Sequence, residues 1–277
     1  MVRKLFCFVL LMDLAGSAYS YNVWTNAAYD RDWMNPLNWS LGAVPGAGTG
    51  RTLISGRGEF GPIPGPIISA GDDAYAGDEG TDVEDGTLDI EGGKFSGPAW
   101  IGLNAVGYFD YNPTIINLGQ YDSGGSIDII NLLLGDSWWF QEAPHVEYNQ
   151  WSGQSIINDW IWLGGKMNLY GGYMKVAGGM IIASDGQPNT LSTLTIYGGV
   201  GGGGVLSLPR SFFDDGTIGG WITNGYLIAD GDGPGAWMIY CDLTREEGRV
   251  LLTSVPEPAT ITLLCLGGLS LIRKKQS

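Results

Sequence analysis

The chain has 277 residues, with 14 Lys and Arg against 29 Asp and Glu, so its formal net charge is −15 at pH 7. This acidic balance disfavours nucleic acids and anionic membrane surfaces as partners. Glycine accounts for 46 residues, more than twice its usual share of about 7%. The single histidine excludes zinc sites built on paired histidines and makes a Ser-His-Asp triad hard to assemble.

The first segment, residues 1–20, has the organisation of an export signal. Two basic residues precede an apolar run over residues 5–12, although an aspartate follows that run directly. Ala18 and Ser20 then form a small-x-small cleavage site. The pattern predicts an N-terminal signal helix that is removed, whereas an amphipathic first helix of the folded domain is the alternative.

The next two segments are expected to precede the main fold. Residues 21–60 are rich in tryptophan, and we expect Trp24, Trp33 and Trp39 to cover one end of the structure as an N-terminal cap. Residues 61–85 combine proline, glycine and a run of acidic side chains, which predicts a linker.

A repeated pattern of apolar, polar, apolar, polar, Gly, Gly occupies the middle of the chain. It occurs over residues 87–95, 167–174 and 194–200. The alternation predicts short strands with one buried face, and the glycine pair predicts a turn after each strand. The side chains expected to point inward are Leu88, Ile90, Leu169, Leu194 and Ile196, and those expected on the opposite face are Asp89, Asn168 and Thr195.

Brief apolar runs closed by Gly or Asp-Gly form a second recurring unit, at residues 99–102, 132–136, 161–165, 180–186 and 226–231. The step from Leu169 to Ile196 is 27 residues, which is typical of solenoid repeats. We therefore expect residues 86–253 to form an all-β, single-stranded, parallel, right-handed β-solenoid with its C-terminal cap. A β-sandwich is the alternative.

The sequence also predicts how the repeat region ends and how much of the chain is helical. Residues 240–252 have the pattern of a last β-hairpin. Outside the two terminal segments, we expect less than about a tenth of the chain to be helical, because strand-forming repeats and glycine turns dominate its composition.

Acidic side chains are the only candidates for a cofactor site. Asp230 and Asp232 form an Asp-Gly-Asp-Gly run that offers carboxylate oxygens to calcium. The run lacks the remaining positions of an EF-hand loop, so a solvated acidic loop is the simpler interpretation. The sequence predicts no cofactor and no resident metal, with calcium as the alternative.

Aromatic side chains are the candidates for ligand binding. Trp138, Trp139 and Trp151 lie in one region and are suited to stacking on sugar rings, although large aromatics also fill cores. Trp160 and Trp162 share one strand face, which is either the core or the exterior. We find no catalytic constellation among the polar residues.

The last segment, residues 254–277, contains three features in fixed order. A Pro-Glu-Pro triplet comes first, an uncharged apolar run over residues 259–272 follows, and a basic cluster comes last; the polar and proline positions are Pro256, Glu257, Pro258, Arg273, Lys274 and Lys275. The apolar run is shorter than the roughly 20 residues that usually span a bilayer, so a buried helix is the alternative for that run alone. The combination resembles the PEP-CTERM protein-sorting signal.

This resemblance implies a route and a set of partners. Export machinery would translocate the chain, the short C-terminal membrane helix would hold an inner-membrane intermediate, and an exosortase-type membrane protease would cleave near the triplet. The protein would then reach the cell surface or the extracellular matrix. The glycine-rich repeats, with Asn38-Trp39 and Val44-Pro45 before them, also resemble the β-solenoid bodies of PEP-CTERM proteins and the stalks of autotransporters.

We therefore expect an exported, non-enzymatic protein with a structural or adhesive role in the exopolysaccharide layer. A polysaccharide-binding or polysaccharide-degrading β-helix protein is the alternative, and a calcium-dependent binding module is a third class. A row of flat aromatic side chains favours binding, whereas clustered acids with a basic partner in one groove favour the enzyme.

Overall fold

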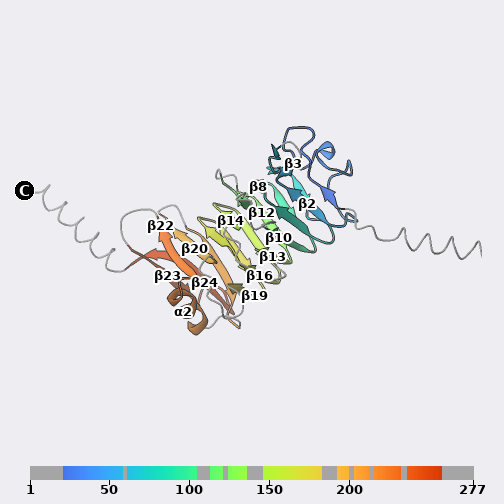
Figure 1. Ribbon diagram of the computed structural model, residues 1–277. Coiled ribbons are helices and arrows are strands. Elements are labelled where there is room, and N and C mark those ends of the chain that lie inside the picture. The colour runs from blue at the N-terminus through green and yellow to red at the C-terminus, as the bar shows by residue number, and fades with distance from the viewer. Residues whose placement is uncertain are drawn as a thin grey trace, which may run out of the picture.

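The fold is described here from a computed structural model, which shows a long stack of short strands (Figure 1). The described residues are 21–58, 61–104, 113–120, 124–135, 146–182, 192–199, 203–211, 215–231 and 236–257. The predicted signal helix and the predicted C-terminal membrane helix lie outside these residues. No helix among the described residues has the length and apolar character needed to cross a membrane.

Three sheets run the length of the stack. In the order of their hydrogen-bonded strands, sheet 1 contains β1 (Asn22–Val23), β2 (Thr52–Ser55), β7 (Thr81–Glu84), β10 (Trp100–Asn104), β13 (Asn131–Leu134), β16 (Trp160–Leu163) and β19 (Gly179–Ile182). Sheet 2 contains β5 (Ile67–Ser69), β8 (Thr87–Glu91), β11 (Thr114–Leu118), β14 (Val146–Gln150), β17 (Lys166–Leu169), β20 (Thr193–Gly198) and β22 (Leu227–Gly231). Sheet 3 contains β6 (Asp73–Tyr75), β9 (Lys94–Ser96), β12 (Ser126–Ile129), β15 (Gln154–Ile157), β18 (Tyr173–Val176), β21 (Val205–Pro209), β24 (Arg249–Pro256) and β23 (Trp237–Asp242).

From β5 to β21 the chain visits the three sheets in rotation, and each strand pairs in parallel with the strand one coil further along. Leu169 pairs with Ile196, so the 27-residue step seen in the sequence is one coil. This topology confirms the prediction of an all-β fold with parallel solenoid pairing. The β-sandwich alternative is wrong, because a sandwich is built from antiparallel neighbours.

The repeated glycines lie at the corner between sheets 2 and 3. Gly153 has a φ of +81° and Gly172 a φ of +74°, which L side chains rarely adopt. A Cβ atom on Gly153 would lie 2.4 Å from the carbonyl oxygen of Gly125, and one on Gly172 would lie 2.5 Å from that of Gly153. Successive coils therefore approach too closely at this corner for any larger residue, which explains why glycine stands directly before β9, β12, β15, β18 and β21.

The core consists of inward side chains that align from coil to coil. Leu88, Ile90, Leu169, Leu194 and Ile196 are all at most 1% exposed, which confirms the predicted inward face of these strands. One coil has polar side chains in its core. The buried phenol of Tyr148 bonds Ser155 Oγ at 2.6 Å and Gln150 Oε1 at 3.1 Å. Ser155 Oγ also donates to Gln150 Oε1 at 2.9 Å, so this polar cluster satisfies itself within the core.

The N-terminal end of the stack is closed by tryptophan. Trp24, Trp33 and Trp39 are at most 3% exposed and pack edge to face, with ring centroids 5.1 Å apart for Trp24–Trp39 and 4.7 Å apart for Trp33–Trp39. Trp33 also packs on Phe95 of β9 at 5.4 Å. The same region contains the 3-10 helix η1 (Pro36–Asn38) and the short antiparallel pair β3 (Arg57–Gly58) and β4 (Gly61–Pro62).

The segment expected to be a linker is part of the stack. Strands β5, β6 and β7 lie within residues 61–85 and pair in parallel with β8, β9 and β10. The solenoid therefore begins well before residue 86. Proline, glycine and acidic residues in this segment occupy the corners between very short strands, and this composition resembles that of a linker when only the sequence is considered.

The C-terminal end changes strand direction. Strand β24 pairs antiparallel with both β21 and β23, so the predicted last hairpin is confirmed. Before this hairpin, helix α2 (Asp215–Thr223) has nine residues and contacts β22. Within the described residues, α2 and η1 are the only helices, in agreement with the low helix content expected from the sequence.

Candidate functional site

The outward face of sheet 2 carries a ladder of amide side chains. Asn117 Nδ2 donates to Asp89 Oδ1 at 2.8 Å, Asn149 Nδ2 to Asn117 Oδ1 at 3.3 Å, and Asn168 Nδ2 to Asn149 Oδ1 at 2.9 Å. Each amide donates to the coil before it, so the hydrogen bonds run in one direction. The bonded residues are 28, 32 and 19 positions apart in the chain, so the ladder joins coils of very different length.

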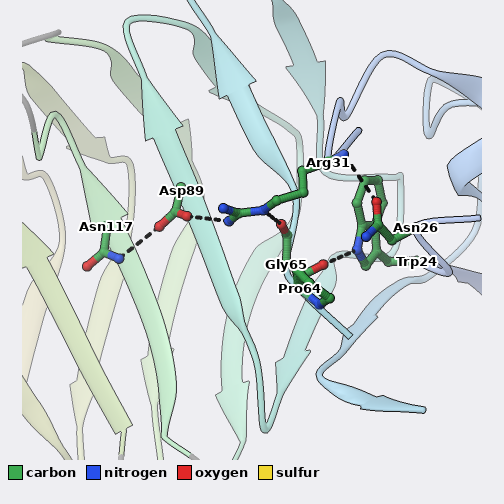
Figure 2. Close-up of polar contacts among 7 residues, drawn as sticks. All are labelled: Trp24, Asn26, Arg31, Pro64, Gly65, Asp89 and Asn117. Atoms are coloured by element: carbon green, nitrogen blue, oxygen red, sulfur yellow. Dashed lines mark hydrogen bonds and ion pairs between the residues drawn. The ribbon is translucent and has the colours of Figure 1, made fainter. Parts of the chain in front are cut away.

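The ladder ends at an ion pair that attaches the N-terminal cap (Figure 2). Arg31 Nη2 donates to Asp89 Oδ2 at 2.7 Å and Arg31 Nε donates to the Gly65 carbonyl at 2.7 Å. Arg31 has a φ of +61°, and its main-chain N–H donates to Asn26 Oδ1 at 3.1 Å. Nearby, Trp24 Nε1 donates to the Pro64 carbonyl at 2.9 Å. These contacts compensate for the strained backbone of Arg31 and hold the cap on sheet 2.

Asp89 is on the predicted face but is covered there. Its side chain points away from the core, as the alternation requires, and Asp89 is only 9% exposed because Arg31 and Asn117 cover it. The alternation predicted the direction of this side chain but not its contacts. Thr195, at the corresponding position of β20, is also only 8% exposed.

Three aromatic rings stack beside the amide ladder. The Trp151 and Tyr170 ring centroids are 5.0 Å apart with an interplanar angle of 12°, and the Tyr170 and Tyr197 centroids are 4.3 Å apart with an angle of 23°. These separations match the spacing of neighbouring strands. Burial, assisted by the neighbouring Tyr170, raises the pKa of Tyr197 to about 12. One face of the Trp151 indole is occupied by Tyr170, which leaves only the opposite face for a sugar.

The other aromatic candidates form two pairs. Trp138 and Trp139 lie outside the described residues. Trp160 and Trp162 alternate with the buried Ile161 and Leu163, so both indoles are on the exterior of sheet 1. The sequence left this choice open, because alternation alone does not say which of the two faces is buried.

The acidic pair considered for calcium is described only in part. Asp230 is exposed, and its Oδ1 accepts a hydrogen bond from the main-chain N–H of Gly231 at 2.8 Å. Asp232 lies outside the described residues. Across the parts of the chain that the structure describes, no three His, Cys, Asp or Glu side chains come together in a group able to hold a metal ion.

A polar cluster that the sequence did not predict lies on sheet 3. Glu246 accepts from Tyr173 Oη at 2.8 Å and from Ser207 Oγ at 3.0 Å, and Arg249 Nε donates to Ser207 Oγ at 2.6 Å. Arg249 Nη2 also donates to the carbonyls of Val176 and Ser207, at 2.6 and 2.7 Å. Because Arg249 is directed at main-chain oxygens, the cluster fastens the terminal hairpin to the stack.

The Pro-Glu-Pro triplet, predicted to belong to a sorting signal, begins at the last described strand. Pro256 is the last residue of β24 and pairs with Trp237, and the main-chain N–H of Glu257 donates to the Ala236 carbonyl at 2.9 Å. Pro258 and the basic residues Arg273, Lys274 and Lys275 lie outside the described residues, as do Ala18 and Ser20 of the predicted signal-peptide cleavage site.

No protein-family model, curated protein or solved structure matches the chain. The role of the chain is therefore inferred from the geometry of the described strands and from the predicted signals in the two terminal segments. The PEP-CTERM resemblance remains a prediction from the sequence.

Proposed function

We propose that this chain is an exported, non-enzymatic protein of the cell surface or extracellular matrix, sorted and cleaved through its PEP-CTERM tail. Its role is structural or adhesive within the exopolysaccharide layer. The body is a right-handed solenoid, the hand that parallel crossover connections almost always adopt. Partners are the export machinery and an exosortase-type membrane protease, and the membrane is contacted only through the C-terminal helix before cleavage.

The observation that carries this proposal is the position of the triplet at the end of β24. Val255 and Pro256 are the last strand residues, paired with Met238 and Trp237. Removing a tail attached at this point would neither break a strand in its middle nor expose the core. A membrane protease acting near the triplet would therefore release the solenoid intact, after fraying at most the last pairs of the hairpin.

A rigid, extended body suits a structural role. The coils are joined by continuous parallel pairing in three sheets, and the amide ladder and aromatic stack add side-chain contacts between successive coils. Such a stack holds its outward faces at a constant spacing along its length. Polysaccharide binding is the second candidate function, favoured by the outward position of Trp160 and Trp162.

The test is to produce the full chain in a bacterium that carries an exosortase and to determine both mature termini by mass spectrometry after cell fractionation. We expect residues 1–20 and the segment after about Val255 to be absent from the surface or secreted form. The Glu257→Ala variant should accumulate as a membrane-held precursor. Glu247→Ala, which changes an exposed glutamate of the folded body, should be processed normally. A secreted protein with an intact C-terminus would refute the proposal.

A further inference from the structure

The end of β24 has fewer neighbours than the rest of that strand. At the C-terminal end of the stack, where β22, β23 and β24 lie together (Figure 1), residues 249–253 pair with β21 and residues 251–256 pair with β23. Residues 254–256 therefore have a single strand neighbour among the described residues. The buried apolar side chains of β24, from Val250 to Leu252, all precede this piece. The piece can therefore separate from β23 while the core of the hairpin stays in place.

The indole of Trp237 fastens this end of the hairpin to sheet 2. Trp237 is the strand partner of Pro256. Its ring lies over Gly198 of β20 and Gly231 of β22, which are themselves paired. A Cβ atom at either glycine would come within 2.7 Å of the ring. Because neither glycine has a side chain, the indole lies directly on the backbone of sheet 2, and we call this pair of glycines the glycine seat.

Two hydrogen bonds supplement the indole. Ser254 Oγ donates to the Asp230 carbonyl at 2.8 Å, and the main-chain N–H of Glu257 donates to the Ala236 carbonyl at 2.9 Å. Pro256 has no N–H and adds no main-chain donor. When the segment opens, water replaces both hydrogen bonds, whereas the burial of the indole is lost outright. Trp237 is therefore expected to contribute most to keeping residues 254–257 closed.

This arrangement matters for any protease that acts near the triplet. An extended peptide is commonly recognised through its main-chain groups, which pair with the partner as an added strand. In β24 these groups already face β23, so residues 254–257 are not available until they leave the hairpin. When opening and closing are fast relative to cleavage, the cleavage rate follows the population of the open form.

We propose that Trp237 is a latch that limits the access of proteases to the first part of the triplet. Residues 254–257 enter a protease only after the indole leaves the glycine seat. The opening stops at Ser254, because residues 251–253 are held between β21 and β23. This inference rests on the proposed function and adds the regulation of its cleavage step, since the folded body would set the rate of its own release from the membrane.

Hydrogen exchange measured by mass spectrometry tests the latch without a protease. The full chain is purified in mild detergent from a host that has no exosortase. Trp237→Ala should speed exchange of residues 254–257 by about tenfold or more, which corresponds to about 1.4 kcal/mol of lost packing, and should leave the central coils unchanged. Gly231→Ala should act in the same direction, because the three atoms closest to a Cβ at this position all belong to the indole. Trp237→Phe should have an intermediate effect.

Two protease measurements follow. A proline-specific endoprotease added to the purified chain should cut after Pro256 faster in Trp237→Ala, by the same factor as the exchange. In a bacterium with an exosortase, pulse-chase labelling should show faster processing of Trp237→Ala by that factor as well. Adding Glu257→Ala should block this processing, which excludes general proteolysis. Tyr240→Ala is the matched control, since it removes a 52% exposed ring from the same strand and should behave like the wild type in all three measurements.

The outcomes separate the latch from its alternatives. Unchanged exchange of residues 254–257 in Trp237→Ala would overturn the inference. So would an equal rise in exchange throughout the stack, because Trp237 would then stabilise the fold as a whole; Trp237→Phe and Gly231→Ala decide the point if the alanine variant is poorly folded. Faster exchange without faster cleavage after Pro256 would also overturn it. If exchange and the added endoprotease respond as expected but even the wild type is not processed in the bacterium, the proposed function fails and the latch stands.

Discussion

Removing the Asp89 carboxylate tests how the N-terminal cap is held. Asp89 accepts from Arg31 Nη2 at 2.7 Å and from Asn117 Nδ2 at 2.8 Å, and its side chain is 12% exposed against 35% for that of Arg31. A hydrogen bond to a charged group contributes about 1.5–3 kcal/mol and a neutral one about 1 kcal/mol. Arg31 keeps its bond to the Gly65 carbonyl and some water contact, which reduces the loss. We therefore expect Asp89→Ala to lower the free energy of unfolding by about 2–3 kcal/mol.

Companion variants separate the two contacts of Asp89. Asp89→Asn retains an oxygen that accepts from Asn117 but loses the charge that pairs with Arg31, so it should cost about 1 kcal/mol. A double-mutant cycle with Arg31→Ala should give a coupling energy of about 1 kcal/mol or more between positions 31 and 89. Asp128→Ala is the matched control, because Asp128 also points outward from a strand and its carboxylate bonds, among the described residues, only the exposed Asn158. This control should stay within about 0.5 kcal/mol of the wild type.

The assay is urea unfolding followed by circular dichroism, analysed at constant m value. Hydrogen exchange of residues 24–40 provides a local measurement, since weakening the ion pair should increase exchange in the cap before it does so in the central coils. If Asp89→Ala behaved like Asp128→Ala, or if the cycle gave no coupling, Arg31 would not hold the cap and the contacts in Figure 2 would have no energetic role.

Three further predictions concern the core, the corners and the tyrosine stack. Leu169→Ala should cost about 2–5 kcal/mol in urea unfolding because it leaves a cavity, whereas the outward Lys175→Ala should stay within about 0.5 kcal/mol; equal effects would contradict the assigned faces. Gly153→Ala should be more destabilising than Gly248→Ala, because both have positive φ but only the former would press a Cβ to 2.4 Å from a carbonyl oxygen of the previous coil. The raised pKa of Tyr197, about 12 against an ordinary 10.0, means that the folded state keeps its phenol proton where the unfolded state has lost it. The free energy of unfolding should therefore fall as pH rises from about 10 to about 12. The fall is at most about 2.7 kcal/mol, and we expect about 1 kcal/mol because solvent screens this partly exposed group. The pH dependence of unfolding of Tyr197→Phe should lack this component.

Much of the fold could be read from local sequence. A strand alternates its side chains between two faces whatever its neighbours are, so the order of polar and apolar residues around Leu88 and Leu169 was sufficient to predict which side chains point into the core. The glycine pairs marked the corners, because a positive φ and a close approach of two backbones exclude other residues there. The distance from Leu169 to Ile196 predicted one coil, and the two residues are indeed paired.

Other features depend on which segments meet, and local sequence does not contain that information. Strands β5 to β7 are too short to be recognised alone and exist because β8 to β10 provide their hydrogen-bond partners. Asp89 is covered by an arginine 58 residues earlier in the chain. The buried Tyr148 is compatible with the core only because Ser155 and Gln150 reach its phenol.

The same distinction applies to the two tryptophans of β16. Alternation alone predicted that Trp160 and Trp162 share one face of their strand, but it could not say whether that face was the core or the exterior. The choice was made by Ile161 and Leu163, whose side chains fit the ladders formed with neighbouring coils, and by Gly179, which leaves space for an indole on the outside. The sequence determined the period and the two faces of each strand, since these follow from backbone geometry within a few residues. Tertiary packing decided which outward residues are covered and which remain accessible, because coverage depends on contacts between residues far apart in the chain.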